Sequence, residues 1–357
     1  MPKILFIVPH RPNRSPSQRF RFEQYLSYIK QNGFDYDYSY LINEKDDKVF
    51  YSHGHIAKKT LLNIKFILQR IKDVSRAKHY DIVFIQREAL FLGTAIFEKL
   101  FSRHTKVIFD FDDAIWLPNV SLANKKFLWL KNPSKVKTAI KSAHHIIAGN
   151  KYLADYAKQY NNNTTIIPTT IDTNTYKYHL PTNKKQVCIG WTGSSTTIKH
   201  LSYILPILET VQKKYGNKVC IKIISDIRPS FNNIEFEFTK WKASSEVEDL
   251  LDIDFGIMPL PDNKWTRGKC GLKALQYMAI GRPAIVSPVG VNTEIVQHNY
   301  NGLVANSKEE WLSAISYIID DYEMRLKLGK NARKTVEQYY SVDANKNKYL
   351  EVFNSLI

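Results

Sequence analysis

The chain has 357 residues, of which 44% are hydrophobic and 13% aromatic, so it can fill the cores of two domains of ordinary size. This composition excludes an intrinsically disordered chain. The formal charge of +17 at pH 7 indicates an anionic partner, and nucleic acid, anionic lipid and phosphorylated small molecules all fit that description.

The spacing of the cysteines and the length of the apolar runs indicate the cellular compartment of the protein. Cys188, Cys220 and Cys270 form no Cys-x-x-Cys pair, which argues against a disulfide framework and against a zinc site. The apolar run at residues 4–8 is too short for the core of a signal peptide or for a membrane span. We therefore expect a cytoplasmic protein.

Short β-branched runs alternate with longer helical patterns along the whole chain. This alternation predicts an α/β fold with parallel sheets that are covered by helices on both faces. Two helical stretches begin with apparent capping boxes, Ser245 with Glu248 and Ser307 with Glu310. The expected strands of the first half are residues 3–8, 35–41, 81–86, 106–111, 145–149 and 164–168. Those of the second half are residues 186–191, 219–225, 234–238, 254–260, 283–287 and 302–305.

A polar, turn-rich stretch at residues 169–185 separates the two sets of strands. We predict one Rossmann-like domain over residues 1–175 and a second over residues 176–340, with a helix over residues 341–357 that packs back on the first domain. Open parallel sheets bind ligands beyond the carboxyl ends of their strands, so two such sheets facing each other would form a cleft. Functional residues are therefore expected on loops directly after strands.

Three carboxylates, Asp110, Asp112 and Asp113, close the apolar run in KVIFDFDDAIW. An apolar strand that runs into Asp-x-Asp resembles the first motif of haloacid-dehalogenase-like, magnesium-dependent phosphohydrolases. In that reading Asp110 attacks phosphate and Asp112 transfers the proton. Asp113 and Ala114 replace the small residue and the Thr expected there, and a complete half-domain precedes the motif. Alternatively, the acids are polar residues on a loop that leaves a buried strand.

A basic loop in the second half of the chain gives the stronger indication of a ligand site. Lys264, Arg267 and Lys269 lie between an expected strand and a helix over residues 272–281. The N-terminus of a helix favours anions, and Lys273 adds a full charge in its first turn. The pattern predicts a diphosphate site.

The segment LKALQYMAIGRPAIVSPVGVNTEIV, with the later NGLV, resembles the donor-binding half of glycosyltransferase family 4, whose members are retaining enzymes of the GT-B fold. The resemblance spans nearly the whole chain and includes KILFIVP at the start and IGWTGSSTTIKHL at the opening of the second domain. It implies two Rossmann-like domains facing across a cleft, an acceptor-binding domain over residues 1–175 and a nucleotide-sugar-binding domain over residues 176–340. It also implies metal-independent transfer of a hexose-type sugar from a UDP- or GDP-linked donor to a glycan or lipid-linked acceptor, in the synthesis of surface polysaccharide or glycoconjugate.

The resemblance also implies roles for individual residues. In the family a basic pair near the opening of the second domain binds the donor diphosphate; Ser194 stands at the upstream position here, and Lys199 matches the downstream lysine. The two glutamates of the family's E-x7-E element would lie near Gly268 and Gln276, and neither is present. The loop instead resembles a Lys-rich variant, KCGLK, which leaves the sugar open.

The residues, together with the roles that the resemblance implies, predict a site with three parts. The catalytic residues are Lys199, Lys273 and Asp112. The donor-binding residues are Gly193, Ser194, Arg267, Lys269, Gln276 and Glu294. The acceptor-side residues are Ser17, Arg19, Asp110 and Asp113. No metal and no cofactor is expected, because Lys199 and Lys273, assisted by Arg267 or Lys269, would stabilise the phosphate charge.

Several of these residues have a second interpretation. Gln276 lies on roughly the same helical face as Lys273 and would bond a ribose hydroxyl. Glu294 lies near a helix start, where an acid also simply favours the helix dipole. Isolated lysines on helices are usually solvated surface charges, which applies most to Lys264 and Lys269.

Two basic amphipathic stretches, residues 55–78 and 124–142, offer places for the positive charge. Such helices can lie on an anionic membrane surface, with Phe127 and Trp129 at the headgroups, as a protein peripheral to the inner face of the plasma membrane would. Alternatively, their apolar faces cover the domain's own sheet. A basic nucleic-acid-binding protein is the alternative from a different class, but no compact recognition motif supports it.

Overall fold

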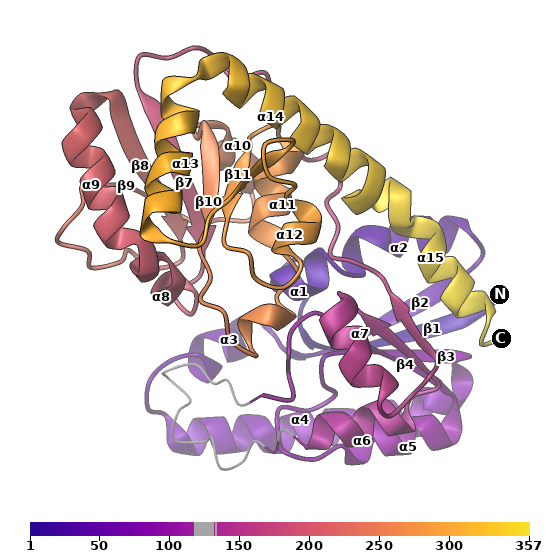
Figure 1. Cartoon of the computed structure of the whole chain (residues 1–357). Helices are drawn as coiled ribbons and strands as arrows, with labels where there is room; N and C mark the ends of the chain where they lie inside the picture. Colours follow the sequence, from indigo (N-terminus) through magenta and orange to yellow (C-terminus); the bar gives the residue numbers. More distant parts are fainter. Residues whose placement is uncertain (118–131, 133) are drawn as a thin grey trace. The chain divides into compact units, whose positions relative to one another are not determined.

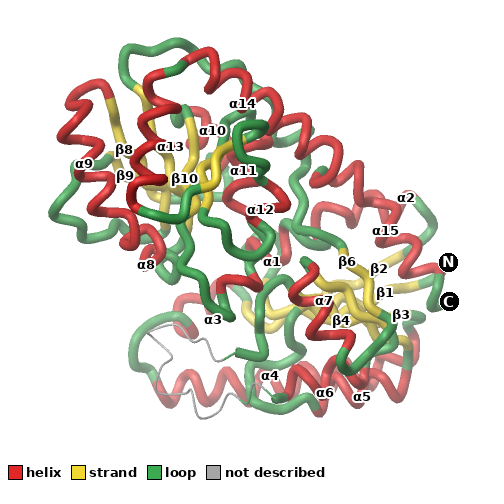
Figure 2. Tube along the Cα trace, viewed as in Figure 1, coloured by secondary structure: helices red, strands yellow, loops and turns green. Residues whose placement is uncertain are grey.

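The computed structural model describes residues 1–117, 132 and 134–357. Phe127 and Trp129, which we assigned to a membrane-facing stretch, lie outside the described residues. The chain divides into two compact units. Unit 1 comprises Met1–Pro168 and Lys346–Ile357, and unit 2 comprises Thr169–Asn345. Each unit contains a six-stranded sheet with helices packed on it, which confirms the predicted α/β class (Figures 1 and 2).

The sheet of unit 1 is parallel, with the strand order β2-β1-β3-β4-β5-β6. Its strands are β1 (Lys3–His10), β2 (Asp35–Ile42), β3 (Ile82–Gln86), β4 (Lys106–Phe111), β5 (His145–Ala148) and β6 (Thr164–Ile166). The strands β1, β3 and β4 read as continuous apolar runs because helices bury both of their faces.

The helices of unit 1 lie on both faces of its sheet (Figure 1). They are α1 (Pro16–Arg19), α2 (Leu26–Gln31), α3 (Glu44–Phe50), α4 (Ile56–Arg76), α5 (Ile96–His104), α6 (Lys135–Ser142) and α7 (Lys151–Lys158). The helix α15 (Val342–Asn354) carries Tyr349 and Phe353 into the aromatic core of unit 1, where both rings contact Phe84. Among the residues described, no helix is both long enough and apolar enough to cross a membrane.

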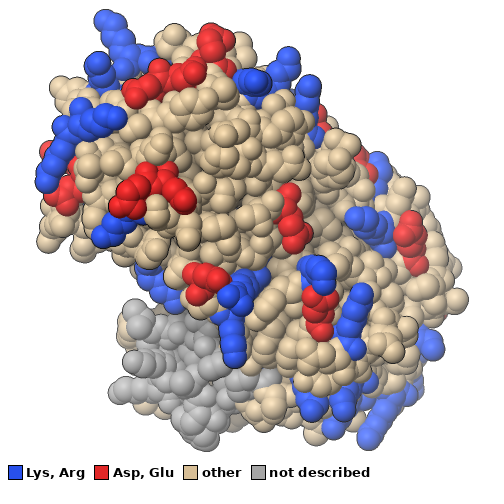
Figure 3. Space-filling model, viewed as in Figure 1, with Lys and Arg blue, Asp and Glu red and all other residues tan. Residues whose placement is uncertain are grey.

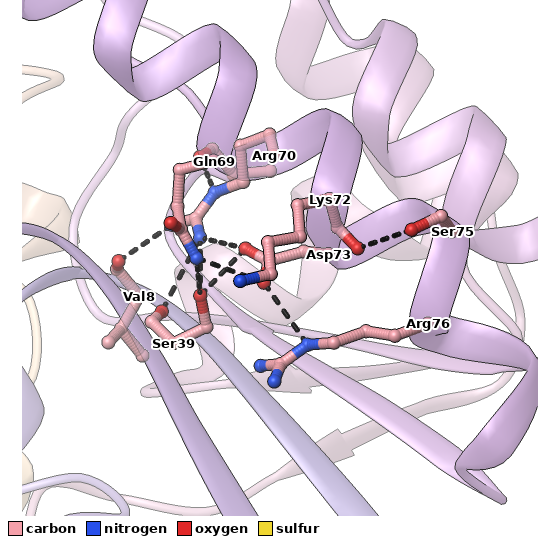
Figure 4. Close-up of polar contacts among 9 residues, drawn as sticks. Val8, Ser39, Gln69, Arg70, Lys72, Asp73, Ser75 and Arg76 are labelled. Carbon is pink, nitrogen blue, oxygen red and sulfur yellow. Dashed lines mark hydrogen bonds and ion pairs between the residues drawn. The ribbon is translucent and has the colours of Figure 1, made fainter.

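A buried ion pair anchors α4 to the sheet of unit 1 (Figure 4). Arg70 and Asp73, both fully buried, bind each other at 2.7 Å between Nη1 and Oδ2. The Arg70 guanidinium also donates to the carbonyl of Val8 on β1 and to the carbonyl of Ala89 beyond β3. Ser39 on β2 donates its hydroxyl proton to Asp73 at 2.6 Å. The inner face of α4 is thus bonded to several parts of one sheet, which fixes the rotation of the helix.

The sheet of unit 2 is also parallel, with the strand order β12-β11-β10-β7-β8-β9. Its strands are β7 (Val187–Gly193), β8 (Val219–Ser225), β9 (Glu237–Lys240), β10 (Phe255–Met258), β11 (Ala284–Val286) and β12 (Gly302–Val304). Its helices are α8 (Ile198–Leu201), α9 (Leu205–Tyr215), α10 (Glu246–Leu251), α11 (Leu272–Ala279), α12 (Asn292–Ile295), α13 (Lys308–Asp320) and α14 (Tyr322–Thr335). Short 3-10 segments lie at Glu23–Tyr25, Ala77–His79, Ser202–Ile204, Gly216–Lys218 and Thr266–Gly268, and a π-helical turn lies at Val336–Tyr340.

The two expected capping boxes differ in outcome. Ser307 and Glu310 form the reciprocal pair of hydrogen bonds at the start of α13, as predicted. The prediction for Ser245 is wrong: its hydroxyl donates to Asp249 and caps no backbone N–H of α10. The reason is its backbone conformation, with ψ near 11°, which departs from the extended geometry that an N-cap needs.

The anchor of α4 predicts a large stability effect. We expect Asp73→Ala to lower the free energy of unfolding by about 3–5 kcal/mol, because it leaves the Arg70 charge buried without its partner. Chemical denaturation followed by circular dichroism measures this loss. The matched control is Asp155→Ala, which breaks an exposed i,i+4 pair with Lys151 and should cost about 0–1 kcal/mol. Equal effects of the two substitutions would show that the buried pair does not anchor the helix.

Candidate functional site

The loop after β7 turns tightly into α8. A Cβ atom on Gly193 would lie 2.4 Å from the Trp191 ring and 2.7 Å from the Thr197 hydroxyl, so glycine is needed there. The Thr197 hydroxyl accepts a hydrogen bond from the backbone N–H of Ser194 at 3.0 Å. This closed loop holds Lys199, in α8, close beyond the carboxyl end of β7.

A buried tyrosine joins the end of β7 to α11. The Tyr277 hydroxyl accepts a hydrogen bond from the backbone N–H of Thr192 at 2.8 Å. Its ring packs on Gly256 of β10, where a Cβ atom would lie 2.0 Å from the ring. On the same helix, Nζ of Lys273 lies 5.5 Å from the centroid of the Trp191 ring. The first turn of α11 therefore lies beside the end of β7.

Three lysines act electrostatically on His200. His200 is buried in α8, and burial lowers its pKa to about 4. The positive charges of Lys273, Lys199 and Lys269 act in the same direction, in that order. Because all three act on one imidazole, the structure brings these predicted residues into a single field of positive charge. We call Lys199, Lys269 and Lys273 the lysine cluster.

Two glycines shape the entrance to α11. Gly271, the N-cap, has a φ of +70°, and a Cβ atom there would lie 2.2 Å from the Cδ1 atom of Ile295. Gly290 has a φ of +56°, and its Cβ atom would lie 2.6 Å from the carbonyl oxygen of Arg267. The loop after β11 thus packs closely on the basic loop, next to a helix N-terminus whose dipole favours an anion.

The other donor-side residues have partners inside unit 2. Arg267 binds both carboxylate oxygens of Asp262, at 2.6 and 2.8 Å, on the exposed surface. Gln276 is buried, and its amide donates to the Tyr176 hydroxyl at 2.9 Å. That hydroxyl donates in turn to Glu246 at 2.8 Å. A contact between Gln276 and a ribose would have to be made alongside this buried network.

Glu294 lies exposed on α12, just beyond β11. Burial raises the pKa of Tyr340 to about 12, and the negative charge of Glu294 adds to this rise. Glu294 therefore lies near Tyr340 and remains accessible to a ligand.

In unit 1, Asp110 and Arg21 form a fully buried pair. Nε of Arg21 donates to one carboxylate oxygen and Nη2 to the other, while Nη1 binds the carbonyl of Ile167. Both oxygens of Asp110 are thus used inside the fold. An attack of this carboxylate on phosphate, or a contact with an acceptor, would require breaking the buried pair.

Asp112 and Asp113 share one cation at the carboxyl end of β4. Nε of Arg87 lies 2.7 Å from Asp112 and Nη2 lies 2.6 Å from Asp113. Arg87 follows β3 and has a φ of +63°, which a non-glycine residue rarely adopts. Burial opposes its charge, but Asp112 and then Asp113 raise the pKa of Arg87 above its ordinary value. The two ion pairs that Arg87 makes hold the acidic loop in one position.

The remaining acceptor-side candidates, Ser17 and Arg19, lie on α1, which follows β1 in the sequence. The Arg19 guanidinium lies 5.0 Å from the Phe20 ring, and the Ser17 hydroxyl lies 3.3 Å from that of Ser15. His10, at the end of β1, binds the Tyr51 hydroxyl at 2.7 Å. Within residues 1–117, 132 and 134–357, no three His, Cys, Asp or Glu side chains are grouped so that they could hold a metal ion.

Sequence reasoning missed three residues that build this site: His200, Trp191 and Tyr277. Trp191 and His200 lie within the IGWTGSSTTIKHL segment, and Tyr277 lies on the helix that we expected to bind phosphate. A single aromatic residue inside a strand or helix looks like ordinary core. Only the packing shows that Trp191 lies under Lys273 and that Tyr277 holds the end of β7.

The lysine cluster predicts the titration of His200. Its pKa in the folded chain, about 4, lies below the ordinary 6.5, so the unfolded chain binds more protons between these values. The contribution of His200 to stability is therefore present above pH 6.5 and is lost as the pH falls towards 4. We expect Lys273→Ala to raise the pKa of His200, as measured by NMR titration of the imidazole. The control is Lys264→Ala, which changes an exposed residue of the basic loop and should leave the pKa of His200 unchanged. If the pKa of His200 were the same in the unchanged chain and in both variants, Lys273 would not contribute to the positive field at His200.

The glycosyl transferases group 1 family model matches residues 227–335, which include the basic loop, α11 and α12. An uncharacterized glycosyltransferase of Methanocaldococcus jannaschii, MJ1607, is 33% identical over 166 residues, which are 43% of this chain and 41% of that protein. The putative glycosyltransferase YtcC of Bacillus subtilis is 34% identical over 85 residues, which are 23% of this chain and 21% of that protein. The matches thus span less than half the length of these relatives.

Solved structures resemble the chain over its whole length. Sucrose-phosphate synthase from Thermosynechococcus elongatus aligns with a TM-score of 0.71 and 13% identity, covering 100% of this chain and 99% of that chain. Anabaena HepE, solved in complex with UDP and glucose, aligns with a TM-score of 0.69 and 14% identity, covering 99% of this chain and 100% of that chain. The chain therefore has the GT-B fold, and its residues 227–335 match the glycosyl transferases group 1 family.

Proposed function

We propose that this chain is a retaining glycosyltransferase of family 4 that moves a hexose-type sugar from a nucleotide-diphosphate donor to a glycan or lipid-linked acceptor. The observation that carries the proposal is the lysine cluster around His200, beside the N-terminus of α11. Like charges brought together repel one another, and a bound diphosphate would relieve that repulsion. The match to the glycosyl transferases group 1 family covers α11 and supports this ligand.

In this proposal the lysines stabilise the charge that develops on the leaving diphosphate. Aromatic rings lie beside two of them: Nζ of Lys269 lies 5.3 Å from the Trp265 centroid, and Lys273 lies over Trp191. Ammonium groups that are already in place need little rearrangement as the bond to the sugar breaks. We therefore propose transfer without a metal ion, because fixed cations supply the charge.

Other residues have supporting roles in the proposal. Glu294 is exposed next to the basic loop and would contact the donor sugar. Gln276 would reach the ribose from its buried network, and Arg267 would bind the donor on release from Asp262. Asp112, held by Arg87, would orient the acceptor hydroxyl. Asp110 has no role in the proposed reaction, because it is paired with Arg21.

The donor and the acceptor are inferred from chemistry and from the neighbours. HepE is described in complex with UDP and with UDP-glucose, which favours a UDP-linked hexose over a GDP-linked one. WaaB is described as a lipopolysaccharide outer core galactosyltransferase, which favours a role in glycoconjugate synthesis. We propose that the reaction takes place in the cytoplasm, at the inner face of the membrane.

The role of Lys273 is directly testable. We expect Lys273→Ala to lower kcat by about 100- to 1000-fold, since removing one preorganised contact to developing charge typically has that effect. Calorimetric titration with UDP and a sugar-transfer assay measure affinity and turnover separately. Lys264→Ala should retain both. Unchanged affinity and turnover in Lys273→Ala would remove α11 from the donor site.

Metal independence is tested by nucleotide binding in excess EDTA. We expect the protein to bind UDP in preference to GDP, ADP and CDP, because the lysine cluster and α11 supply the charge. The shift in melting temperature on addition of each nucleotide measures the preference. Binding that appears only with magnesium, together with release of phosphate, would instead support a phosphohydrolase that uses Asp110 and Asp112.

A further inference from the structure

The outer face of α4 presents a row of apolar side chains to solvent. The residues are spaced three to five apart, which places them along one side of the helix. Surface helices normally carry polar residues there. The members, which we call the outer stripe, are between 50% and 66% exposed: Ile56, Leu61, Ile64, Leu68 and Ile71.

The helix cannot turn to bury the outer stripe. Its opposite face carries Lys59, Phe66, Arg70 and Asp73, all buried. Arg70 and Asp73 are bonded to each other and to residues of the sheet, as shown in Figure 4. Rotation would expose Phe66 and break the buried ion pair. The fold therefore presents the outer stripe as a fixed surface.

Basic residues predominate around the outer stripe, although α3, which also contacts α4, carries Glu44 and Asp46 as well as Lys45 and Lys48. The helix α4 contacts α5, and α5 contacts α6, so the three form one layer on the sheet. Within these helices, which the structure describes in full, the only acids are Asp73 and Glu98, and both are buried. Lys and Arg side chains gather over α5 and α6 in Figure 3. The exposed basic residues of the layer are Lys58, Lys65, Lys72, Lys99, Arg103, Lys137 and Lys141.

We propose that the outer stripe docks on the surface of an anionic lipid bilayer. The helix α4 would lie in the plane of the interface, with its Ile and Leu side chains at the acyl boundary and the lysines at the headgroups. Lys65, bound to Asp46 of α3, still keeps half of its side chain exposed.

The charge distribution favours a bilayer over other partners. A second copy of the chain would bring the same basic layer against this one, and the like charges would repel. Nucleic acid would satisfy the lysines but would leave the exposed Ile and Leu side chains without an apolar partner. An anionic membrane offers both negative headgroups and an apolar interior within a few ångströms.

This inference deepens the proposed function, because a lipid-linked acceptor would be presented on the same membrane. Its physical basis is the surface of unit 1, whereas the donor site is in unit 2. The two proposals can therefore be tested apart.

Co-sedimentation with vesicles of phosphatidylcholine, with and without phosphatidylglycerol, tests the inference on the full chain. We expect binding to vesicles that contain phosphatidylglycerol, and a loss of at least about tenfold in Leu61→Gln/Leu68→Gln. Lys58→Gln/Lys72→Gln should reduce the preference for phosphatidylglycerol and the sensitivity to salt. The matched control is Leu180→Gln, an equally exposed leucine in unit 2, which should bind as the unchanged chain does.

Circular dichroism and UDP titration of each variant show whether it is folded and whether its donor site works. Vesicle binding that is equal in the stripe variant and the unchanged chain would overturn the inference. Self-association that the stripe substitutions abolish, without vesicle binding, would assign the surface to a second copy instead. Stripe-dependent vesicle binding by a chain that binds no nucleotide would uphold the membrane surface and count against the proposed glycosyltransferase.

Discussion

Parallel strands that are buried on both faces leave the loops at their carboxyl ends as the main place for polar chemistry, and both units obey this constraint. In unit 2, the loops after β7 and β10 and the first turn of α11 bring Lys199, Lys269 and Lys273 around one histidine. In unit 1, the loops after β3 and β4 bring Arg87 to Asp112 and Asp113. Candidate functional residues that are far apart in sequence meet because the sheets collect these loops at one edge.

Buried and half-buried charges have different neighbours in different parts of the fold. In unit 1, Arg21 and Asp110 bind each other, as do Arg70 and Asp73, so opposite charges are balanced within the fold. In unit 2, Lys273, Lys199 and Lys269 add to the effect of burial in lowering the pKa of His200. A buried pair costs desolvation but can fix a conformation, whereas a cluster of one sign destabilises the fold until an anion arrives. The lysine cluster is therefore the feature on which the proposed diphosphate site depends.

The sequence was sufficient for the architecture but not for the partners of individual side chains. All twelve strands overlap the expected runs, and the central strands do so because burial of both sheet faces needs apolar, β-branched residues. The edge strand β9 begins three residues later than expected and is only partly buried. The partner of Asp110 was not predictable, since Arg21 lies 89 residues away and meets it only through packing. Gln276 seemed to face a ligand, yet its amide binds Tyr176, 100 residues away. His200 had no motif of its own, and its importance follows from its three neighbours.

The helix α4 shows why periodicity alone left the membrane question open. An amphipathic pattern predicts one apolar face, and that face normally covers the sheet. Here the inner face holds a buried arginine and aspartate as well as Phe66, while much of the aliphatic surface points outward. The sequence gives the spacing of the residues along the helix, but it does not show which face packs on the sheet. The structure separates the two faces because Arg70 must point at Val8, Ser39 and Ala89, and that requirement sets the direction of every other side chain on the helix.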